Sequence, residues 1–311
     1  MNSDYDVIII GAGCTGYGAA LYSGRFELKT LIIGEVKGGT IIQTNDVANY
    51  PGFKQIDGFE LATKLEQHAL DYSSVSQKEG KVIKLEKIED LFKVYLENGE
   101  NFTSKTVILA TGTEWKQLGV PGEKEYTGKG IHYCALCDGG FYKNKKIVVV
   151  GGGDSAVKES NLLSTYGSEV IVLVRKDVLK GEPVNVSRAL KNPKIKFMYN
   201  VEVKEIYGDG KKANKCKLYD NKENTTQDFN FDGMFIEIGH NALSDLAKQL
   251  GVQIDSRGEV IIDRHGFTNV EGFFAAGDVV DTNFKQAITG VAEGVTASYN
   301  AYEYIEKKFK N

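Results

Sequence analysis

Residues 5–16 read YDVIIIGAGCTG, and this stretch decides the fold. An apolar run leads into Gly11, Gly13 and Gly16, which have the spacing of a dinucleotide-binding turn between a strand and a helix. The first glycine permits the tight bend, the second lets the backbone approach a pyrophosphate, and the third lets the helix pack closely on the strand. The segment therefore predicts phosphates bound at a helix N-terminus. A glycine-rich turn without a ligand is the alternative.

The same pattern returns at residues 146–156, which read KIVVVGGGDSA. Here Gly151, Gly153 and Ala156 are the spaced small residues, and a helix is expected from about Asp154. A strand, a glycine turn and a helix thus occur twice in the chain. The recurrence predicts a second dinucleotide site.

Apolar strands that end in small residues follow at 107–113, 233–239 and 272–278. Together with the two turns they predict an α/β protein with two Rossmann-like dinucleotide-binding domains of the three-layer ββα type, the second inserted into the first. We expect residues 1–115 and 243–311 to form the discontinuous first domain. Residues 116–242 would form the second.

The composition is that of an ordinary globular protein, with 311 residues, 41% hydrophobic and 26% charged. A net charge of −4 gives no reason to expect a nucleic acid as a partner, because a basic patch would be needed to follow its phosphates. No apolar run approaches the roughly 18 residues that span a bilayer, so no membrane partner is expected. The four cysteines include one close pair, which does not make a disulfide framework. A cytoplasmic protein is therefore expected.

The close pair is Cys134-Ala135-Leu136-Cys137, followed directly by Asp138. Such a pair can close a small disulfide, and a helix start lowers the thiol pKa. Asp138 could shuttle the proton that thiolate chemistry requires. Half of a zinc site is the alternative, but the chain has no second C-x-x-C or clustered His pair, so no metal is expected. His132 either tunes Cys134 or is structural.

The ends of the second strands indicate which nucleotide each site takes. In the second domain no carboxylate stands at the strand end, where one would bind the ribose 2′-hydroxyl of NAD. The strand is followed instead by the basic residues Arg175, Lys176 and Lys180, which favour the 2′-phosphate of NADPH. A solvated basic turn is the alternative. In the first domain the expected acidic position is Gly34, and Glu35 comes one residue later. Glu35 either contacts a ribose or is a surface glutamate.

On these motifs the chain resembles the low-molecular-weight thioredoxin reductases, which are FAD- and NADPH-dependent pyridine nucleotide-disulfide oxidoreductases, over essentially its whole length. A Cys pair inside the second nucleotide domain is a specific mark of this group. The matching stretches are Gly11-Ala12-Gly13, Lys37-Gly38-Gly39-Thr40, Asn49-Tyr50-Pro51-Gly52-Phe53, Ala110-Thr111-Gly112, Cys134-Ala135-Leu136-Cys137-Asp138-Gly139, Gly151-Gly152-Gly153-Asp154-Ser155-Ala156 and Ala276-Gly277-Asp278.

The resemblance implies an enzyme that moves electrons from NADPH through FAD and the dithiol to thioredoxin or a thioredoxin-like protein. Cys137 would face the flavin and Cys134 would attack the partner disulfide. It also implies a homodimer and a rotation of the domains about crossings near Trp115 and Ala242. The FAD residues would be Gly11, Gly13, Gly16, Glu35, Gly39, Thr40, Asn49, Ala110, Gly112, Gly277, Asp278 and Gln286. The NADPH residues would be Gly151, Gly153, Asp154, Ser155, Arg175, Lys176 and Lys180.

The chain departs from the family where it would bind the nicotinamide nucleotide. Val174 stands where the family has His, and Lys176 and Lys180 stand where it has arginines. Lysine keeps the charge but loses the bidentate geometry. A related enzyme that uses another donor or acceptor, such as ferredoxin or small dithiols with oxygen, is therefore an alternative. A flavin-binding redox sensor without turnover is another, against which Asp138 beside Cys137 argues.

Overall fold

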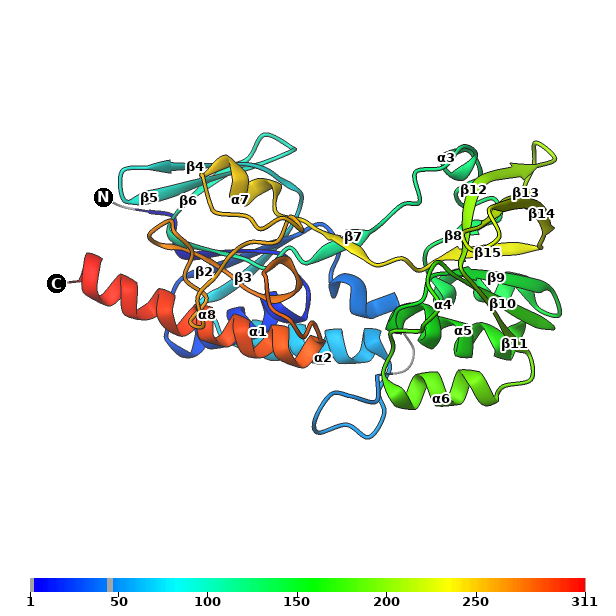
Figure 1. The fold of residues 1–311 in the computed structure, drawn as a ribbon. Helices are drawn as coiled ribbons and strands as arrows, with labels where there is room; N and C mark the ends of the chain where they lie inside the picture. Colours follow the sequence, from blue (N-terminus) through cyan, green and yellow to red (C-terminus); the bar gives the residue numbers. More distant parts are fainter. Residues whose placement is uncertain (1–2, 44–46, 311) are drawn as a thin grey trace. The chain divides into compact units, whose positions relative to one another are not determined.

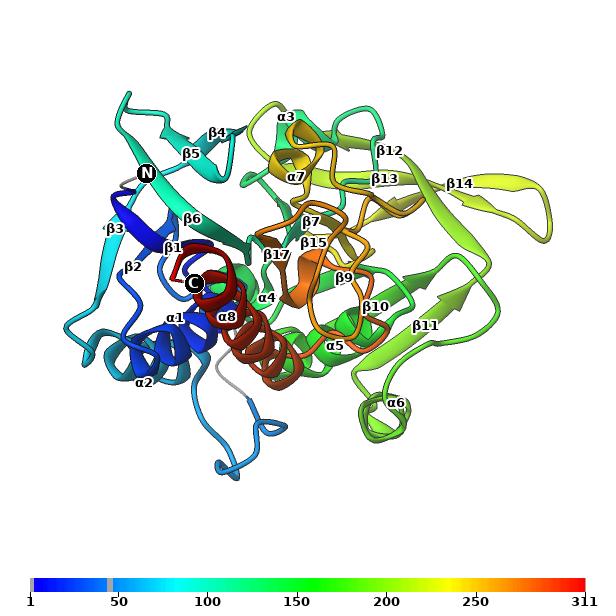
Figure 2. The ribbon, with the colours of Figure 1, turned by 90° about the vertical axis from the view of Figure 1, so that its left-hand side faces the viewer.

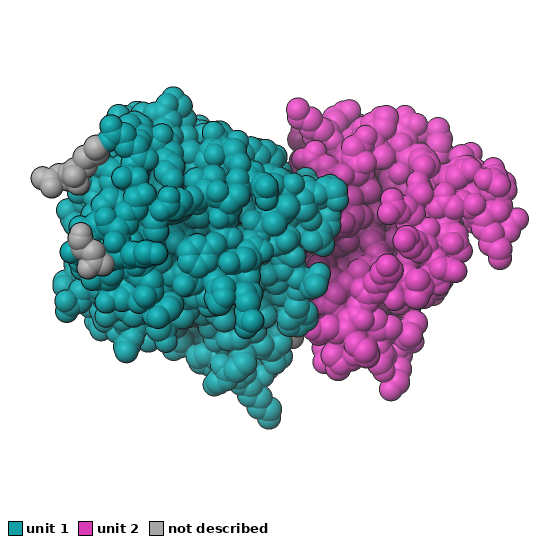
Figure 3. Space-filling model, turned by 60° about the vertical axis from the view of Figure 1, so that its left-hand side comes forward, with its two compact units in different colours: residues 1–114, 241–311 teal, residues 115–240 magenta. Residues whose placement is uncertain are grey.

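The computed structural model describes residues 3–43 and 47–310. The chain divides into two compact units, which are drawn in different colours in Figure 3. Unit 1 contains residues 1–114 and 241–311, and unit 2 contains residues 115–240. Each unit has its own sheets and its own hydrophobic core, so each is described by itself.

Unit 1 is built on a sheet with the strand order β3-β2-β1-β6-β5-β4, in which β17 also pairs with β6. Strands β3, β2, β1, β6 and β17 are paired in parallel, whereas β4, β5 and the first half of β6 form an antiparallel meander. The strands are β1 (Tyr5–Ile10), β2 (Thr30–Gly34), β3 (Val75–Glu79), β4 (Val82–Ile88), β5 (Leu91–Leu96), β6 (Asn101–Leu109) and β17 (Phe273–Ala275). The helices are α1 (Cys14–Arg25), α2 (Gly58–Leu70), α7 (Asp245–Gln249) and α8 (Ala287–Phe309), with short 3-10 turns η1 (Gly39–Gln43) and η3 (Gly277–Val279).

The alternation of side chains along β1 sets the layers of unit 1. Val7 and Ile9 are in the core cluster that contains Ala301 of α8, and Ile8 is in the cluster that contains Phe92 and Val94 of β5. Successive residues of a strand point to opposite faces, so one strand serves both clusters. Figure 2 shows α1 and α8 lying side by side over one face of this sheet. Helices, parallel strands and meander form the three expected layers.

Unit 2 repeats this plan. Its parallel sheet has the order β11-β10-β9-β15-β8, and its antiparallel sheet has the order β12-β13-β14 (Figure 1). The strands are β8 (Ile131–His132), β9 (Lys146–Val150), β10 (Glu169–Val174), β11 (Ile195–Tyr199), β12 (Val201–Gly208), β13 (Ala213–Asp220), β14 (Thr225–Asn230) and β15 (Gly233–Ile236). The helices are α3 (Glu123–Tyr126), α4 (Ala135–Asp138), α5 (Asp154–Tyr166) and α6 (Pro183–Lys191), with the 3-10 turn η2 (Gly139–Tyr142).

Strand β9 divides the core of unit 2 as β1 divides that of unit 1. Ile147 and Val149 pack in the cluster of Leu163 from α5, whereas Val148 and Val150 pack in the cluster that contains β12 and β13 residues. The apolar run at 233–239 was expected to be one strand. It is shorter, because β15 ends at Ile236 and Gly239 adopts a φ of +99°, outside the extended region.

The chain crosses between the units in two short strands, β7 (Thr113–Trp115) and β16 (His240–Ala242), which pair with each other. The contacts divide the chain between Glu114 and Trp115 and between His240 and Asn241. No helix in the described part of the chain is long and apolar enough to cross a membrane.

Candidate redox and nucleotide sites

Cys134 and Cys137 form a disulfide at the start of α4, with their Cα atoms 5.3 Å apart. Cys134 is the N-cap, and the backbone N–H of Cys137 donates to its Sγ at 3.1 Å. The helix has only four residues, so its macrodipole is weaker than the sequence argument assumed. The helix start therefore supplies one backbone N–H donor to the Cys134 sulfur.

Cys14 and Cys216, the other two cysteines, are buried free thiols with low reactivity. Burial raises the pKa of the Cys14 thiol, and separately that of the Cys216 thiol, to about 12. Both therefore stay protonated at neutral pH, and a thiol is a far weaker nucleophile than a thiolate. Among the described residues, no group of three or more His, Cys, Asp or Glu side chains could hold a metal ion.

Asp138 is held by a buried histidine that the sequence could not assign. The Nδ1 atom of His132 lies 2.9 Å from the Asp138 carboxylate, and its Nε2 atom lies 2.7 Å from the hydroxyl of Tyr142. The His132 side chain is only 6% exposed, whereas that of Asp138 is 30% exposed. The carboxylate next to Cys137 therefore reaches solvent at one side and a fixed ring at the other.

The first glycine turn has the geometry that its spacing predicts. A Cβ on Gly11 would collide with the carbonyl oxygen of Ala110, and one on Gly16 would collide with the carbonyl oxygen of Gly11. At Gly13 the nearest atoms to such a Cβ would be 3.8 Å away, which is ordinary contact. The protein itself does not require glycine at position 13. A pyrophosphate close to this backbone would require it.

The residues expected around a flavin come from distant parts of unit 1. The N–H of Gly38 donates to the carbonyl of Ala12 at 2.7 Å, and this bond brings the segment with Gly39 and Thr40 beside the first turn. The side-chain amide of Asn49 donates to the side-chain oxygen of Gln286 at 2.9 Å. Gln286 is the N-cap of α8, so this contact ties a loop to the start of the last helix.

Two further segments complete this edge of the sheet. The N–H of Ala110 donates to the carbonyl of Ile10 at 2.7 Å, and Gly112 follows with a φ of +68°. Gly277 adopts a φ of +81° in η3 beside Asp278. The first segment follows β6, which pairs in parallel with β1, and the second follows β17, which pairs in parallel with β6. Ligands of such sheets bind at the carboxyl ends of the strands.

The structure explains why the acidic residue after β2 is displaced by one position. A Cβ on Gly34 would collide with the side chain of Ala12 in the first turn, so no carboxylate fits there. Glu35, the next residue, is exposed. Its side chain stands in solvent at the end of β2.

A cavity of about 850 Å³ lies in unit 2, at the carboxyl ends of β9, β10 and β15. All seven residues expected to bind NADPH line it: Gly151, Gly153, Asp154, Ser155, Arg175, Lys176 and Lys180. As in the first turn, a Cβ on Gly151 would collide with a carbonyl oxygen, here that of Glu237, while at Gly153 the nearest atom would be 3.9 Å away. The cavity thus has an open approach to the backbone where a pyrophosphate would lie.

The basic side chains at this cavity are exposed. Within residues 3–43 and 47–310, Arg175, Lys176 and Lys180 take no part in an ion pair. Lys180 is held by its backbone, since its N–H donates to the carbonyl of Gly152 at 2.6 Å. Asp154, by contrast, is engaged within the protein, because its carboxylate accepts the N–H of Glu182 at 2.7 Å.

Glu237 is a residue of this cavity that sequence reasoning missed. It is 7% exposed and follows β15 directly. Burial, together with the charge of Glu159, raises the pKa of its carboxyl to about 9. Burial also raises the pKa of Glu159 to about 7. A glutamate between Ile236 and Ile238 in an apolar run was the signal that could have identified it.

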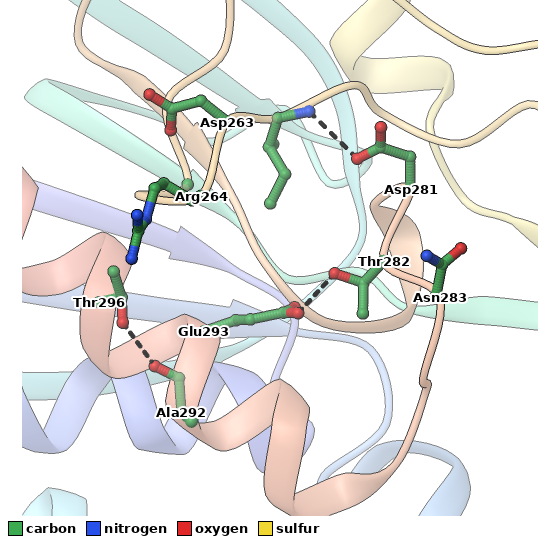
Figure 4. Close-up of a pocket in the computed structure, with 10 residues that line it drawn as sticks. Asp263, Arg264, Asp281, Thr282, Asn283, Ala292, Glu293 and Thr296 are labelled. Carbon is green, nitrogen blue, oxygen red and sulfur yellow. Dashed lines mark hydrogen bonds between the residues drawn. The ribbon is translucent and has the colours of Figure 1, made fainter.

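A smaller cavity of about 420 Å³ lies in unit 1 and is lined by none of the expected site residues. Figure 4 shows residues that line it, and among them the carboxylate of Glu293 accepts the hydroxyl of Thr282 at 2.6 Å. The same carboxylate accepts the N–H of Gly277 at 2.8 Å. Glu293, which lines this cavity, therefore fixes the backbone of Gly277, the residue before Asp278.

Comparisons with known proteins agree with this geometry. The family model of pyridine nucleotide-disulphide oxidoreductases matches residues 5–294. A protein of Listeria innocua named thioredoxin reductase is 40% identical over 308 residues, which is 97% of this chain and 94% of that protein. The crystal structure of Lactococcus lactis thioredoxin reductase has a TM-score of 0.94 at 37% identity, covering 98% of this chain and 100% of that one. The crystal structure of T. acidophilum thioredoxin reductase has a TM-score of 0.91 at 36% identity, covering 97% and 99%.

Proposed function

The chain belongs to the pyridine nucleotide-disulphide oxidoreductase family, and on this basis we propose that it acts as a thioredoxin reductase. The enzyme uses FAD and NADPH. NADPH, a proton and oxidised thioredoxin give NADP⁺ and reduced thioredoxin. The observation that carries the proposal is that the Cys134–Cys137 disulfide lies in the same unit as the cavity with the second glycine turn.

We assign FAD to unit 1. Bound there, FAD supplies the two-electron relay between a nicotinamide and a disulfide. The open space at Gly13 fits its pyrophosphate, because any side chain at that position would stand where the phosphates approach the backbone. Asn49, Gln286 and Asp278 offer amide and carboxylate groups at the same edge of the sheet. The remaining expected contacts are Gly11, Gly16, Glu35, Gly39, Thr40, Ala110, Gly112 and Gly277.

We assign NADPH to the cavity of unit 2. Its pyrophosphate fits the open backbone at Gly153, and its 2′-phosphate fits the exposed basic groups Arg175, Lys176 and Lys180. Since these groups form no ion pair among the described residues, their charge is available to a phosphate. Arg175 is the group with the planar fork that matches phosphate oxygens.

The dithiol transfers the electrons to the partner by disulfide exchange. The Cys134 thiolate attacks the disulfide of thioredoxin, which forms a mixed disulfide and releases one thioredoxin thiolate. The Cys137 thiolate then attacks Cys134, which reforms the Cys134–Cys137 disulfide and releases the second thioredoxin thiolate. Asp138 exchanges protons with these sulfurs. In this assignment Cys137 is the thiol that faces the flavin.

We further propose that the enzyme is a cytoplasmic homodimer, with thioredoxin or a thioredoxin-like protein as its partner. A dithiol that must be kept reduced suits a reducing compartment. The net charge of −4 offers no excess of basic groups for a nucleic acid.

An anaerobic titration tests the electron donor, with the visible flavin band as the readout. Each NADPH carries two electrons and the Cys134–Cys137 disulfide takes up one pair, so the band should bleach fully only at about two equivalents of NADPH. NADH should bleach it only at higher concentration. Bleaching by reduced ferredoxin but not by NADPH would favour the alternative donor. Full bleaching by NADPH without reduction of added thioredoxin would favour the sensor without turnover.

A further inference from the structure

We propose that His132 is a positioning residue for Asp138, and through it for proton exchange at the Cys134–Cys137 dithiol. The proposal rests on the proposed function only in taking Asp138 as the group that exchanges the proton. It starts from one contact, the 2.9 Å approach of His132 Nδ1 to the Asp138 carboxylate.

The ring of His132 is fixed by the sheet and by aromatic neighbours. His132 lies on β8 and is paired with Phe235 on the parallel strand β15. The two rings stack with centroids 5.2 Å apart, and the ring of Tyr142 meets both of them edge-on. A ring that is 6% exposed and packed in this way cannot turn to follow a moving carboxylate. Asp138 must therefore come to the ring.

Tyr142 determines which nitrogen of the neutral ring carries the hydrogen. Burial, with the charges of Asp138 and Asp232, raises the pKa of the Tyr142 phenol to about 12, so it keeps its proton at neutral pH. Its hydroxyl can donate to Nε2, which lies 2.7 Å away. The Nδ1 atom then carries the N–H and donates it to Asp138. The chain of donors runs from Tyr142 to His132 to Asp138.

This arrangement stabilises the carboxylate that remains after proton transfer. When Asp138 protonates a thiolate, a carboxylic acid and a thiolate become a carboxylate and a thiol, and no other reactant is needed. The fixed N–H of His132 faces the carboxylate that forms. Asp232 is a second carboxylate whose charge acts on Tyr142, and it accepts the N–H of Lys146 at 2.9 Å.

A histidine that only fills the core would show the same burial, so the test must separate packing from donation. In His132→Asn the side-chain amide can stand where Nδ1 stands and donate to Asp138. In His132→Gln the amide reaches the position of Nε2 instead. The two variants introduce the same chemical group and differ in which partner it serves, so each is the control for the other.

The measurement is the rate at which iodoacetamide alkylates Cys134 and Cys137 as a function of pH. The FAD-loaded protein is first reduced with dithiothreitol, which is then removed. NADPH and thioredoxin are absent, so a failure of this proposal is distinct from a failure of the proposed reductase activity. Asp138→Asn removes a charge that repels the thiolate, so it should lower the half-maximal pH by about half a unit to one unit.

His132→Gln should shift the half-maximal pH in the same direction as Asp138→Asn but by less, because the carboxylate keeps its charge and loses only its fixed position. The double variant should shift no further than Asp138→Asn alone. His132→Asn should stay close to the wild type. Equal shifts in His132→Asn and His132→Gln, additive shifts in the double variant, or an unshifted His132→Gln would each overturn the proposal.

Tyr142→Phe keeps the proposal testable if His132→Gln does not fold. It retains the ring contacts and removes only the hydroxyl that orients the neutral imidazole. A shift of the same sign but smaller size is expected in the wild-type background. No shift is expected in the His132→Asn background, because an amide needs no partner to fix its donor. An unshifted Tyr142→Phe in the wild-type background would count against the proposal.

Discussion

Asn49 and Gln286 are joined by a hydrogen bond of 2.9 Å between their side chains, although 237 positions separate them in the chain. Gln286 also caps α8, where its side chain accepts the N–H of Thr289. The loop before α2 and the first turn of the last helix are therefore held together at the edge of the sheet where FAD is assigned. This contact makes the two segments one binding surface.

Replacing Asn49 with Ala should weaken FAD binding about fivefold. The loss of one hydrogen bond in a positioned pair is worth roughly 1 kcal/mol, and about 1.4 kcal/mol is tenfold in affinity. Reconstitution of the FAD-free protein, followed by flavin fluorescence, measures the change. Gln286→Ala should cost more, because it also removes the cap of α8. The control is Thr296→Ala, since the Thr296 hydroxyl donates only within its own helix. Equal affinity in all three variants would contradict the assignment.

Replacement of Cys134 and replacement of Cys137 should block turnover at different steps of the disulfide exchange. Cys137→Ser leaves the attacking Cys134 without a resolving thiol, so a mixed disulfide with thioredoxin should accumulate. Cys134→Ser should not form that adduct. Both variants should lose turnover and keep FAD. Non-reducing electrophoresis detects the adduct. Trapping by Cys134→Ser instead would reverse the two roles, and wild-type turnover in both would exclude the dithiol from the relay.

NADPH should be preferred over NADH by about a hundredfold, with Arg175 as the main cause. Charge-assisted hydrogen bonds contribute roughly 1.5–3 kcal/mol each, and two of them suffice after screening by salt. Arg175→Ala should raise KM for NADPH and leave turnover at saturating NADH unchanged. Initial rates with both nucleotides measure this. Lys191→Ala, on α6 and outside the cavity lining, is the matched control. Poor, equal efficiency with both nucleotides in the wild type would contradict the prediction.

Glu237 should make the protein less stable as the pH rises. Its carboxyl has a pKa of about 9 in the folded protein against an ordinary value of 4.5, so between these values the folded chain binds more protons than the unfolded chain. The free energy of unfolding then falls with increasing pH, by up to about 1.4 kcal/mol per pH unit from this group. Glu237→Gln should remove the contribution of this carboxyl, leave that of Glu159 below about pH 7, and be more stable than the wild type at pH 8. Urea unfolding from pH 5 to 9 measures it.

The control for this experiment is Glu223→Gln, a change at an exposed turn position that should leave the slope unchanged. If the wild type and Glu237→Gln show the same pH dependence, the carboxyl is ionised in the folded protein. Water or a cation would then have to reach it, contrary to its burial.

The sequence by itself determined the elements whose causes are local. The glycine spacing from Gly11 to Gly16 predicts the first turn because part of its steric requirement is local. Gly11 has a φ of +118°, and a Cβ on Gly16 would collide with the carbonyl oxygen of Gly11. The apolar run from Lys146 to Val150 before the second glycine turn predicts a strand, and β9 has these bounds. The C-x-x-C spacing predicts a disulfide for a similar reason, since its two residues lie in one helical turn.

Only the tertiary structure decided which distant groups meet. The contact of Asn49 with Gln286 depends on where β6, β17 and α8 bring the chain, and no spacing records that. The partnership of His132 with Asp138 and Tyr142 depends on the parallel pairing of β8 with β15, which packs the ring against Phe235. The raised pKa of Glu237 depends on the burial that its neighbours impose. Local conformation follows from short-range sterics, whereas burial and long-range contacts follow from the packing of whole layers.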